Sequence, residues 1–363
     1  MFSVFDHAMM ARALRLAQRG MFITTPNPRV GCVITRGETV LGEGHTQPAG
    51  QDHAEVQALK ACAAAAADTR GATAYVTLEP CSHFGRTPPC ADALLRAGIG
   101  RVVAAMVDPN PLVAGNGLRK LQQQGIETAA GLLAAEAREL NIGFVSRMER
   151  GRPWLRVKLA ASIDGRTALA NGISQWITGP AARADVHRWR ARSCAMLTGS
   201  GTVLADDPEL TVRLVATTRQ PQRIVVDAQL QTPPEAKIVA PGTLIICANV
   251  EIQRAAALQQ RGTELLALPA ADGRIDLPAL LTELGRRGCN EVMVEAGAGL
   301  AGALLQNRLV DEIVLYQAPL LLGSGARGLF EVPLLSAMAQ RTELSLHDLR
   351  QIGKDIRMIL RLA

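Results

Sequence analysis

The sequence predicts an α/β protein built from two successive domains. Apolar runs with strand character recur along the whole chain, at 31–34, 74–78, 102–106, 154–159, 223–227, 244–247 and 291–295. Helical stretches such as 55–66 and 91–97 lie between the early runs, and this alternation is typical of helices that cover a sheet. Because 363 residues exceed the size at which one hydrophobic core usually stops growing, we expect two such domains.

The amino terminus and the region near residue 150 set the limits of these domains. Asp6 is expected to cap an amphipathic helix that ends before Gly20, and this segment lacks the layout of a signal peptide. Charge, glycine and proline coincide at 148–153, which is typical of a domain boundary. The predicted domains are residues 1–147 and 151–363.

Bulk composition excludes several classes of protein. Hydrophobic residues make up 48% of the chain, yet no apolar run approaches the ~18 residues that cross a bilayer. The net charge of +6 favours anionic partners, but the basic residues are scattered and aromatic residues are only 3%, so we expect phosphorylated small molecules rather than nucleic acid. Seven cysteines, an odd number, favour a reducing compartment, and we expect a cytoplasmic protein.

The most informative motif is His53-Ala54-Glu55 followed by Pro80-Cys81 and then Cys90. This order of one His, one free Glu and two Cys is the signature of zinc-dependent nucleobase deaminases. One imidazole and two thiolates fill three corners of a zinc tetrahedron, and the open fourth corner indicates a catalytic site. Zinc lowers the pKa of bound water from ~15.7 towards ~7, so a nucleophile for hydrolysis exists at neutral pH.

Glu55 is expected to move protons rather than to bind the metal. Two positions along a helix correspond to a rotation of ~200°, which turns Glu55 away from the side of His53. A carboxylate placed in this way suits general acid/base catalysis. The alternative is that Cys81 and Cys90 are unrelated buried thiols and that His53 only caps a helix, but a strand-like run leads directly into Cys81 and favours the zinc site.

A glycine-rich turn marks the second half of the chain. Gly297 to Gly302 reads G-x-G-x-x-G after an apolar strand, where backbone N–H groups can hold a phosphate. The motif alone is weak, and a turn that merely packs helix on strand is the alternative. An ordinary dinucleotide fold is not supported, because Asp311 and Glu312 precede the next strand instead of following it.

Taken together, these motifs resemble those of the bifunctional riboflavin-biosynthesis deaminase/reductase family over essentially the whole chain. The resemblance includes the long loop between Cys81 and Cys90 and the segments 25–31, 158–166, 174–178 and 199–213. It implies a cytidine-deaminase-like domain followed by a dihydrofolate-reductase-like domain. The first would remove the 2-amino group of 2,5-diamino-6-(ribosylamino)-4(3H)-pyrimidinone 5′-phosphate, and the second would reduce the ribosyl group with NADPH to give 5-amino-6-(5-phosphoribitylamino)uracil.

The resemblance also implies roles for individual residues. His53, Cys81 and Cys90 would bind one zinc ion per chain, with Glu55 as the catalytic proton carrier. The expected contacts to the deaminase substrate are Asn27, His45, His83 and Arg86. The expected NADPH contacts are Ala160, Trp176, Thr202, Asp206, Gly297, Ala298, Gly299, Leu300, Ala301, Gly302 and Ala303. The expected contacts to the reductase substrate are Lys158, Ser174, Arg190, Leu210, Arg213 and Glu295.

Some points stay open at the level of sequence. His45 and His83 could be ordinary loop residues, and Lys158 could be a solvated charge. Asp52 stands where the family commonly has proline, and Ala228 where it often has serine. Competing interpretations are a nucleic-acid-editing deaminase with an RNA-binding second half, and a regulatory protein that has lost one activity. The resemblance further suggests a homodimer formed through the reductase domain.

Overall fold

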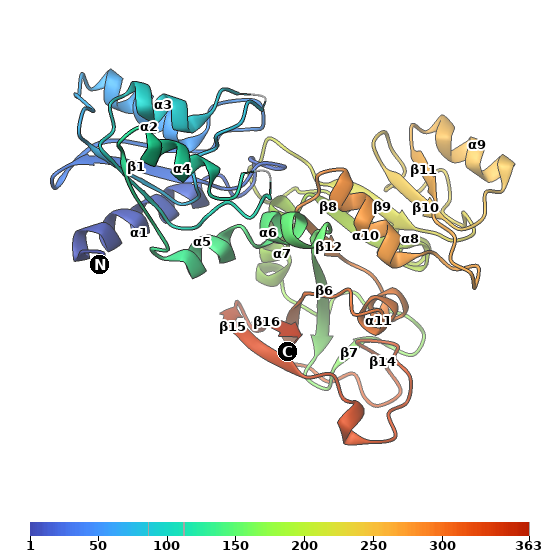
Figure 1. The fold of residues 1–363 in the computed structure, drawn as a ribbon. Helices are drawn as coiled ribbons and strands as arrows, with labels where there is room; N and C mark the ends of the chain where they lie inside the picture. Colours follow the sequence, from blue (N-terminus) through green and yellow to red (C-terminus); the bar gives the residue numbers. More distant parts are fainter. Residues whose placement is uncertain (86, 112, 363) are drawn as a thin grey trace. The chain divides into compact units, whose positions relative to one another are not determined.

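The chain folds into two compact units, Met1–Gly151 and Arg152–Ala363 (Figure 1). The structure, a computed structural model, describes residues 1–85, 87–111 and 113–362. Helix α6 (Ile142–Arg150) closes the first unit, so residues 148–150 of the predicted boundary segment are helical. Gly151 ends α6 with a φ of 69°, a conformation that glycine adopts without a steric cost.

The amino-terminal unit is a mixed sheet with helices on both faces. Its strands run in the order β2-β1-β3-β4-β5, with β1 antiparallel to its neighbours and β3, β4 and β5 parallel. The strands are β1 Gly31–Arg36, β2 Thr39–His45, β3 Thr73–Val76, β4 Arg101–Ala104 and β5 Glu127–Ala130. The helices are α1 Val4–Gln18, α2 Ala54–Ala64, α3 Cys90–Arg96, α4 Asn116–Gln123 and α5 Ala134–Leu140.

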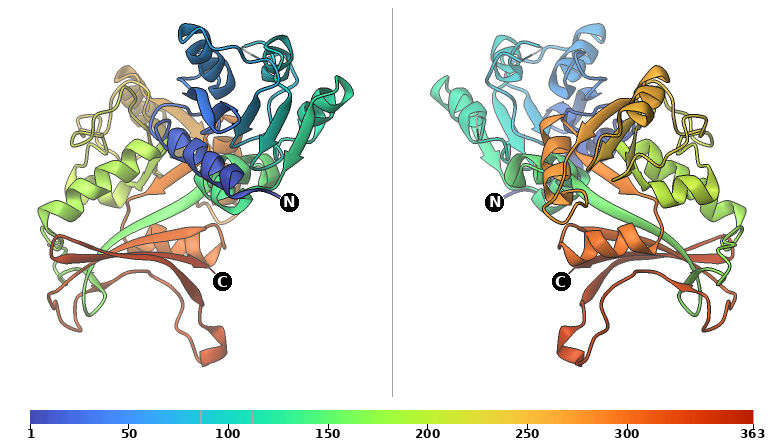
Figure 2. Two further views of the ribbon diagram at one scale, coloured as in Figure 1. Left: turned by 90° about the vertical axis from the view of Figure 1, so that its left-hand side faces the viewer. Right: turned by 90° about the vertical axis from the view of Figure 1, so that its right-hand side faces the viewer.

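Two glycines let helices approach this sheet closely. A side chain at Gly31 would collide with the α1 backbone at Ala13, and one at Gly44 would collide with the α2 backbone at Ala54. Figure 2 shows α1, in dark blue, lying against the strands. The sequence analysis was wrong about the cap of α1, because Ser3 is the N-cap and Asp6 is its partner in a capping box.

The carboxy-terminal unit is built on a long sheet whose strands run β11-β10-β9-β8-β12-β6-β13-β16-β15. The first seven strands of this order, from β11 through β6 to β13, are parallel to one another. Strands β16 and β15 add an antiparallel hairpin at the β13 end. The strands of the unit are β6 Trp154–Ser162, β7 Arg166–Ala168, β8 Ala195–Gly199, β9 Gln222–Val226, β10 Leu244–Cys247, β11 Glu264–Ala267, β12 Glu291–Val294, β13 Glu312–Ala318, β14 Arg327–Gly328, β15 Leu344–Ile352 and β16 Asp355–Leu362.

Helices cover both faces of this second sheet. They are α7 Pro180–Arg192, α8 Ser200–Asp206, α9 Ile252–Gln260, α10 Leu277–Arg286 and α11 Ala298–Gln306, with a short 3-10 turn at Met338–Gln340. Helices α10 and α11 pack into one core with alternate side chains of β6 and β12. The opposite face packs against α7 and α9, so Arg156 on β6 lies over the Trp189 ring of α7. Every second residue of β6 therefore faces α7.

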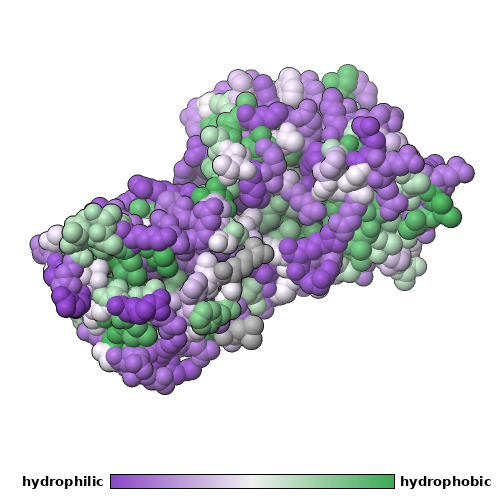
Figure 3. Space-filling view, turned by 90° about the horizontal axis from the view of Figure 1, so that it is seen from above, coloured by the Kyte–Doolittle hydropathy of each residue, from purple (hydrophilic) through white to green (hydrophobic). Residues whose placement is uncertain are grey.

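The surface and helix lengths agree with the composition. The face seen in Figure 3 is mainly hydrophilic, and its apolar residues gather in separate patches. Within the part of the chain that the structure describes, no helix has the length and apolar character needed to cross a membrane.

Candidate active sites

The three predicted zinc ligands meet where α2 and α3 begin. His53 occupies the N-cap position of α2, and Cys90 is the first residue of α3. Nδ1 of His53 lies 3.3 Å from Sγ of Cys90 and 3.7 Å from Sγ of Cys81. All three ligand atoms lie within 4.8 Å of one another. These side chains converge on one point, as a shared metal ion requires.

A zinc ion fits between these atoms. Zn–S bonds of ~2.3 Å and Zn–N bonds of ~2.0 Å at tetrahedral angles separate neighbouring ligand atoms by about 3.5 Å. The separations of 3.3 and 3.7 Å lie on either side of that value. Among the described residues, no fourth His, Cys, Asp or Glu belongs to this group. One corner of the tetrahedron is therefore left for water, as in catalytic zinc sites.

The thiols and the imidazole shift one another's protonation. A hydrogen bond with Cys90, supported by His53, holds the pKa of Cys81 well below its usual range. The pKa of Cys90 is raised, first by Cys81 and then by burial. The hydrogen bond with Cys81 raises the pKa of His53. The cluster therefore favours a thiolate beside an imidazolium, and a metal ion that binds these side chains would displace their remaining protons into solvent.

Glu55 lies beside the cluster without joining it. It is the second residue of α2 and is only 3% exposed. Burial, and then the charge of Cys81, raise the pKa of its carboxyl to about 7. A carboxyl group that titrates near neutral pH can both accept and return a proton. Asp52 accepts hydrogen bonds from Gln57 and Lys60 of α2, so this departure from the family ties the ligand loop to the helix.

The predicted substrate contacts of this unit differ in how far they are exposed to solvent. Asn27 and His45 are half-buried, whereas His83 is exposed on the loop after Cys81. Arg86 lies outside the described residues. Burial and the charge of Arg19 lower the pKa of His45, which favours its neutral form.

The sequence analysis missed two buried carboxyl groups near the cysteines. Glu79 accepts hydrogen bonds from four backbone N–H groups, those of Asp108, Gly115, Gly117 and Leu118. It thereby fixes the end of the strand that leads to Cys81. Burial raises the pKa of Asp108 to about 6, and the charge of Glu79 adds to this, while the backbone hydrogen bond from Asn110 opposes it. The position of Glu79 next to Pro80-Cys81 was the available signal, whereas Asp108 carried none.

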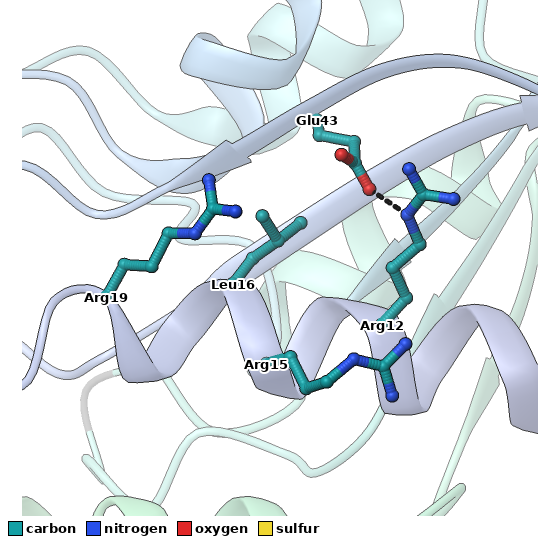
Figure 4. Close-up of a pocket in the computed structure, with 5 residues that line it drawn as sticks. All are labelled: Arg12, Arg15, Leu16, Arg19 and Glu43. Atoms are coloured by element: carbon teal, nitrogen blue, oxygen red, sulfur yellow. Dashed lines mark hydrogen bonds and ion pairs between the residues drawn. The ribbon is translucent and has the colours of Figure 1, made fainter.

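Helix α1 and the edge strand β2 line a cavity of about 300 Å³ (Figure 4). Its walls are Arg12, Arg15, Leu16, Arg19 and Glu43. Arg12 pairs with Glu43, which is the dashed line in the figure. Glu43 and His45 are two positions apart on β2, so their side chains lie on the same face of the strand. The cavity is basic, and none of the zinc ligands lines it.

In the carboxy-terminal unit, an ion pair forms just beyond the end of β12. Nε and Nη2 of Arg190 on α7 donate to the two carboxylate oxygens of Glu295, at 2.6 and 2.9 Å. Burial lowers the pKa of Lys158 on β6, while the charge of Glu295 opposes this change. Lys158 is half-buried beside this pair, so it is not simply a solvated surface charge.

The glycine turn lies next to α8. The backbone N–H of Gly297 donates to Oγ1 of Thr202 at 3.2 Å, which brings two predicted cofactor contacts together. Helix α11 begins at Ala298, directly after its N-cap Gly297. A side chain at Gly302 would collide with the backbone of Glu331, so packing accounts for this glycine. Nothing lies within 4 Å of the corresponding position at Gly297, which leaves the start of α11 accessible.

The remaining predicted contacts differ in their exposure. Trp176 is 68% exposed, with the Arg183 guanidinium 4.4 Å from its ring centre. Ala160, Ser174 and Ala303 are half-buried, Gly299 and Asp206 are exposed, and Ala301 and Leu210 are buried. Ala301 belongs to the core, so only its backbone can contact a ligand.

Arg213 is far more exposed than the Arg190–Glu295 pair, with 52% of its side chain exposed against 12% and 13%. Its Nη1 donates to Glu209 at 2.6 Å and to Oγ1 of Thr211 at 2.9 Å. The fork of Arg190 is turned to Glu295, whereas Nε and Nη2 of Arg213 make no hydrogen bond to any described residue. Arg213 can therefore offer a free guanidinium edge to an anion.

Known proteins match both halves of the chain. A model of the cytidine and deoxycytidylate deaminase zinc-binding region matches residues 3–106, and a model of the RibD C-terminal domain matches residues 153–358. The riboflavin biosynthesis protein RibD of Escherichia coli K12 is 51% identical over 97% of this chain and 98% of its own length. The RibD protein of Haemophilus influenzae is 45% identical over 98% and 97%.

Solved structures agree with these matches. The structure of Acinetobacter baumannii RibD, form 2, is 43% identical, covers 99% of each chain and has a TM-score of 0.90. A Thermotoga maritima diaminohydroxyphosphoribosylaminopyrimidine deaminase/5-amino-6-(5-phosphoribosylamino)uracil reductase is 30% identical, with 99% coverage of each chain and a TM-score of 0.87. The family resemblance and the two fold types that it implied are confirmed. The chain belongs to the RibD family of bifunctional riboflavin-biosynthesis enzymes, with a zinc-binding deaminase domain followed by a reductase domain.

Proposed function

We propose that this enzyme deaminates 2,5-diamino-6-(5-phosphoribosylamino)pyrimidin-4(3H)-one and then reduces the ribosyl side chain with NADPH. The product is 5-amino-6-(5-phosphoribitylamino)uracil. The observation that carries the first step is the convergence of His53, Cys81 and Cys90 beside the buried carboxyl of Glu55. The observation that supports the second is the open turn at Gly297 next to the Lys158, Arg190 and Glu295 group.

In the deaminase domain, the chain's own residues hold the metal and move protons. Zinc held by His53, Cys81 and Cys90 would lower the pKa of a water molecule, which would then supply hydroxide to the carbon that carries the amino group. The buried carboxyl of Glu55 would take the proton of that water and return it to the departing amine, which leaves as ammonia. Because the Glu55 pKa is near 7, one group can serve in both directions.

In the reductase domain, the first turn of α11 suits a cofactor phosphate. Its backbone N–H groups begin at a glycine N-cap with no side-chain cap among the described residues. We infer NADPH rather than NADH because the two acidic residues that follow the glycine turn in the sequence, Asp311 and Glu312, are both paired with arginines. Asp311 pairs with Arg152, and Glu312 pairs with Arg156 and Arg361. Both lie at the start of β13, away from the strand ends that hold the turn.

Arg213 is the candidate contact for the substrate phosphate, because its Nε and Nη2 edge is free among the described residues. Lys158 and Glu295 lie beside each other, since β12 and β6 are paired in parallel with Val294 opposite Val157. Their opposite charges can contact the ribose that accepts hydride. Arg190 would then act by holding Glu295 in place.

One experiment tests both steps. Purified enzyme with zinc is supplied with the diaminopyrimidine phosphate, and ammonia release and NADPH oxidation are followed together. We expect ammonia to appear first and NADPH oxidation to follow with equal final amounts. The same assay with NADH should be much slower. Ammonia release without NADPH oxidation, or comparable kcat/KM for the two cofactors, would contradict the proposal.

We further propose a cytoplasmic homodimer joined through the reductase domain. The seven cysteines, all within the described residues, form no disulfide bond with one another, which is consistent with a reducing compartment. Strand β15 ends the strand order of the long sheet, and Leu344, Leu346 and Leu349 are exposed on it. An exposed apolar edge strand is suited to pairing with a second chain. Sedimentation velocity should give a dimer, and Leu349→Asp should weaken it; a monomer at micromolar concentration would contradict this.

A further inference from the structure

His187 is a buried histidine that none of the motifs predicted. It lies on α7, three residues before Arg190, and only 6% of its surface is exposed. Its Nδ1 accepts a hydrogen bond of 3.1 Å from the backbone N–H of Arg213. Helix α7 therefore holds both the ion pair at Glu295 and the segment that carries the candidate phosphate contact.

The segment 211–213 is held by side chains rather than by a strand ladder. Nη1 of Arg190 donates to the carbonyl of Thr211 at 3.1 Å. Gln220 accepts from the N–H of Val212 at 2.8 Å and donates to its carbonyl at 3.0 Å. His187 is the described side chain that reaches the backbone of Arg213 itself. Loss of His187 leaves the other two anchors in place, so the loss should loosen Arg213 without unfolding the segment.

The protonation state of His187 is fixed by its surroundings. Burial, followed by the charges of Arg190 and Arg213, lowers its pKa to about 4, and Glu295 opposes this only in part. The ring is therefore neutral at physiological pH. Since Nδ1 accepts from an N–H group, the proton must be on Nε2. A single tautomer gives the hydrogen bond to Arg213 a fixed direction.

The guanidinium of Arg213 is also held in a fixed orientation by hydrogen bonds. Its Nη1 is held by Glu209 and Thr211, which leaves Nε and Nη2 as a free fork. With the backbone held by His187 and the tip by these two residues, the side chain is fixed at both ends. A bidentate contact to phosphate depends on such geometry, because both N–H groups must meet oxygens at once.

We propose that His187 is a positioning residue of the reductase site, which fixes the backbone of Arg213 so that its guanidinium binds the 5′-phosphate of the substrate. This inference rests on the proposed role of Arg213. It assigns the residue a part in recognising the phosphorylated substrate rather than in the transfer of hydride.

Two substitutions at His187 separate positioning from packing. His187→Asn keeps an acceptor near the place of Nδ1, whereas His187→Leu keeps apolar bulk and removes the acceptor. His187→Ala repeats the test if Leu does not pack. Each variant is assayed as the full zinc-loaded enzyme with NADPH and the deaminated substrate, either phosphorylated or as the free nucleoside. Its deaminase activity serves as an internal control.

We expect His187→Leu to raise KM for the phosphorylated substrate about tenfold with kcat nearly unchanged, the size of one lost hydrogen bond. The free nucleoside should be reduced equally by wild type and variant, and His187→Asn should restore most of the loss. Equal impairment of Asn and Leu variants, or an equal loss with both substrates, would overturn the inference.

A double-mutant cycle distinguishes failure of this inference from failure of the proposed function. Arg213→Ala alone tests whether Arg213 binds the phosphate, because it should abolish the preference for the phosphorylated substrate. If it does so, His187→Leu should add little in the Arg213→Ala background. If Arg213→Ala has its effect while His187→Leu has none, only the role of His187 is wrong. If Arg213→Ala leaves the preference intact, the assignment of Arg213 itself is wrong.

Discussion

The two candidate sites are encoded in different ways. The zinc site takes its four residues from 53 to 90, three of them at the starts of α2 and α3 and Cys81 from the loop between β3 and α3. The reductase group draws on β6, α7, the 209–213 segment and the turn after β12, which span more than a hundred residues of sequence. A metal ion requires particular ligand atoms at short distances, so its site leaves a motif. A site for a cofactor and a sugar phosphate relies on backbone groups and ion pairs, and much of it leaves none.

Two histidines show the same contrast in electrostatics. The pKa of His53 is raised by its contact with Cys81, whereas burial and two arginines lower the pKa of His187 to about 4. The first belongs to a cluster whose side chains would release protons on binding a metal ion. The second is held neutral as a hydrogen-bond acceptor. Four experiments test this contrast between the two sites.

The largest effect is expected from Cys81→Ser. The hydroxyl is a much poorer zinc ligand than a thiolate, so bound zinc should fall from about one per chain to near zero and deamination should be lost. Reduction of the already deaminated substrate should persist. Metal analysis and both assays on the same preparation provide the measurement. Full deaminase activity in a protein free of metal would show that the cluster is not the catalytic centre.

Glu55→Gln should have the next largest effect, because it removes the proton carrier and keeps every zinc ligand. Deamination should fall by about 10²–10⁴-fold, which is the usual contribution of general acid/base catalysis. Zinc content and reduction should match the wild type. If the variant loses its zinc, Glu55 supports the metal site rather than proton transfer.

Sequence alone was sufficient to pick out the three side chains that the structure brings together at the candidate zinc site, because their identity and order constrain the chemistry. It also placed the main strands, since buried parallel strands are continuous apolar runs such as Leu244–Cys247. It missed the carboxy-terminal hairpin, whose strand β15 alternates apolar and polar residues without a buried face. The cap of α1 was misplaced by three residues, because Ser3 and Asp6 are both good caps and only the backbone shows which one begins the helix.

The reductase group was only partly predictable. Arg190 and Glu295 were expected as separate substrate contacts, but the structure pairs them with each other. Such a pair joins residues 105 positions apart, and no local pattern reports it. His187 could not be predicted for the same reason: the role proposed for it depends on one hydrogen bond to a residue distant in the sequence.

Arg213→Ala should impair reduction and spare deamination, the opposite of what is expected for Cys81→Ser and Glu55→Gln. Loss of a charged hydrogen-bond donor to phosphate costs about 1.5–3 kcal/mol, or roughly 10–150-fold in kcat/KM for reduction. Deamination should be spared. Assays of this variant and Glu55→Gln on both substrates form a two-by-two comparison. Equal loss of both activities in either folded variant would show that the two groups act as one coupled site.

The smallest effect concerns the stability of the reductase domain at low pH. The folded-state pKa of His187, about 4, lies below the ~6.5 of an unfolded chain. Unfolding therefore takes up a proton between these values, so this contribution to stability is complete above about pH 6.5 and is lost as pH falls towards 4. Between pH 7.5 and 5 it should lower the free energy of unfolding by up to about 2 kcal/mol.

His187→Asn removes the titrating group, so the variant should lose less stability than the wild type over this range of pH. The measurement is simple to confine to one domain, because the three tryptophans, Trp154, Trp176 and Trp189, all lie after residue 151. Denaturant unfolding followed by their fluorescence reports on the reductase domain alone. Parallel pH dependence in variant and wild type would mean that His187 is not held neutral by burial and its arginine neighbours, and that its hydrogen bond to Arg213 lacks the fixed direction inferred for it.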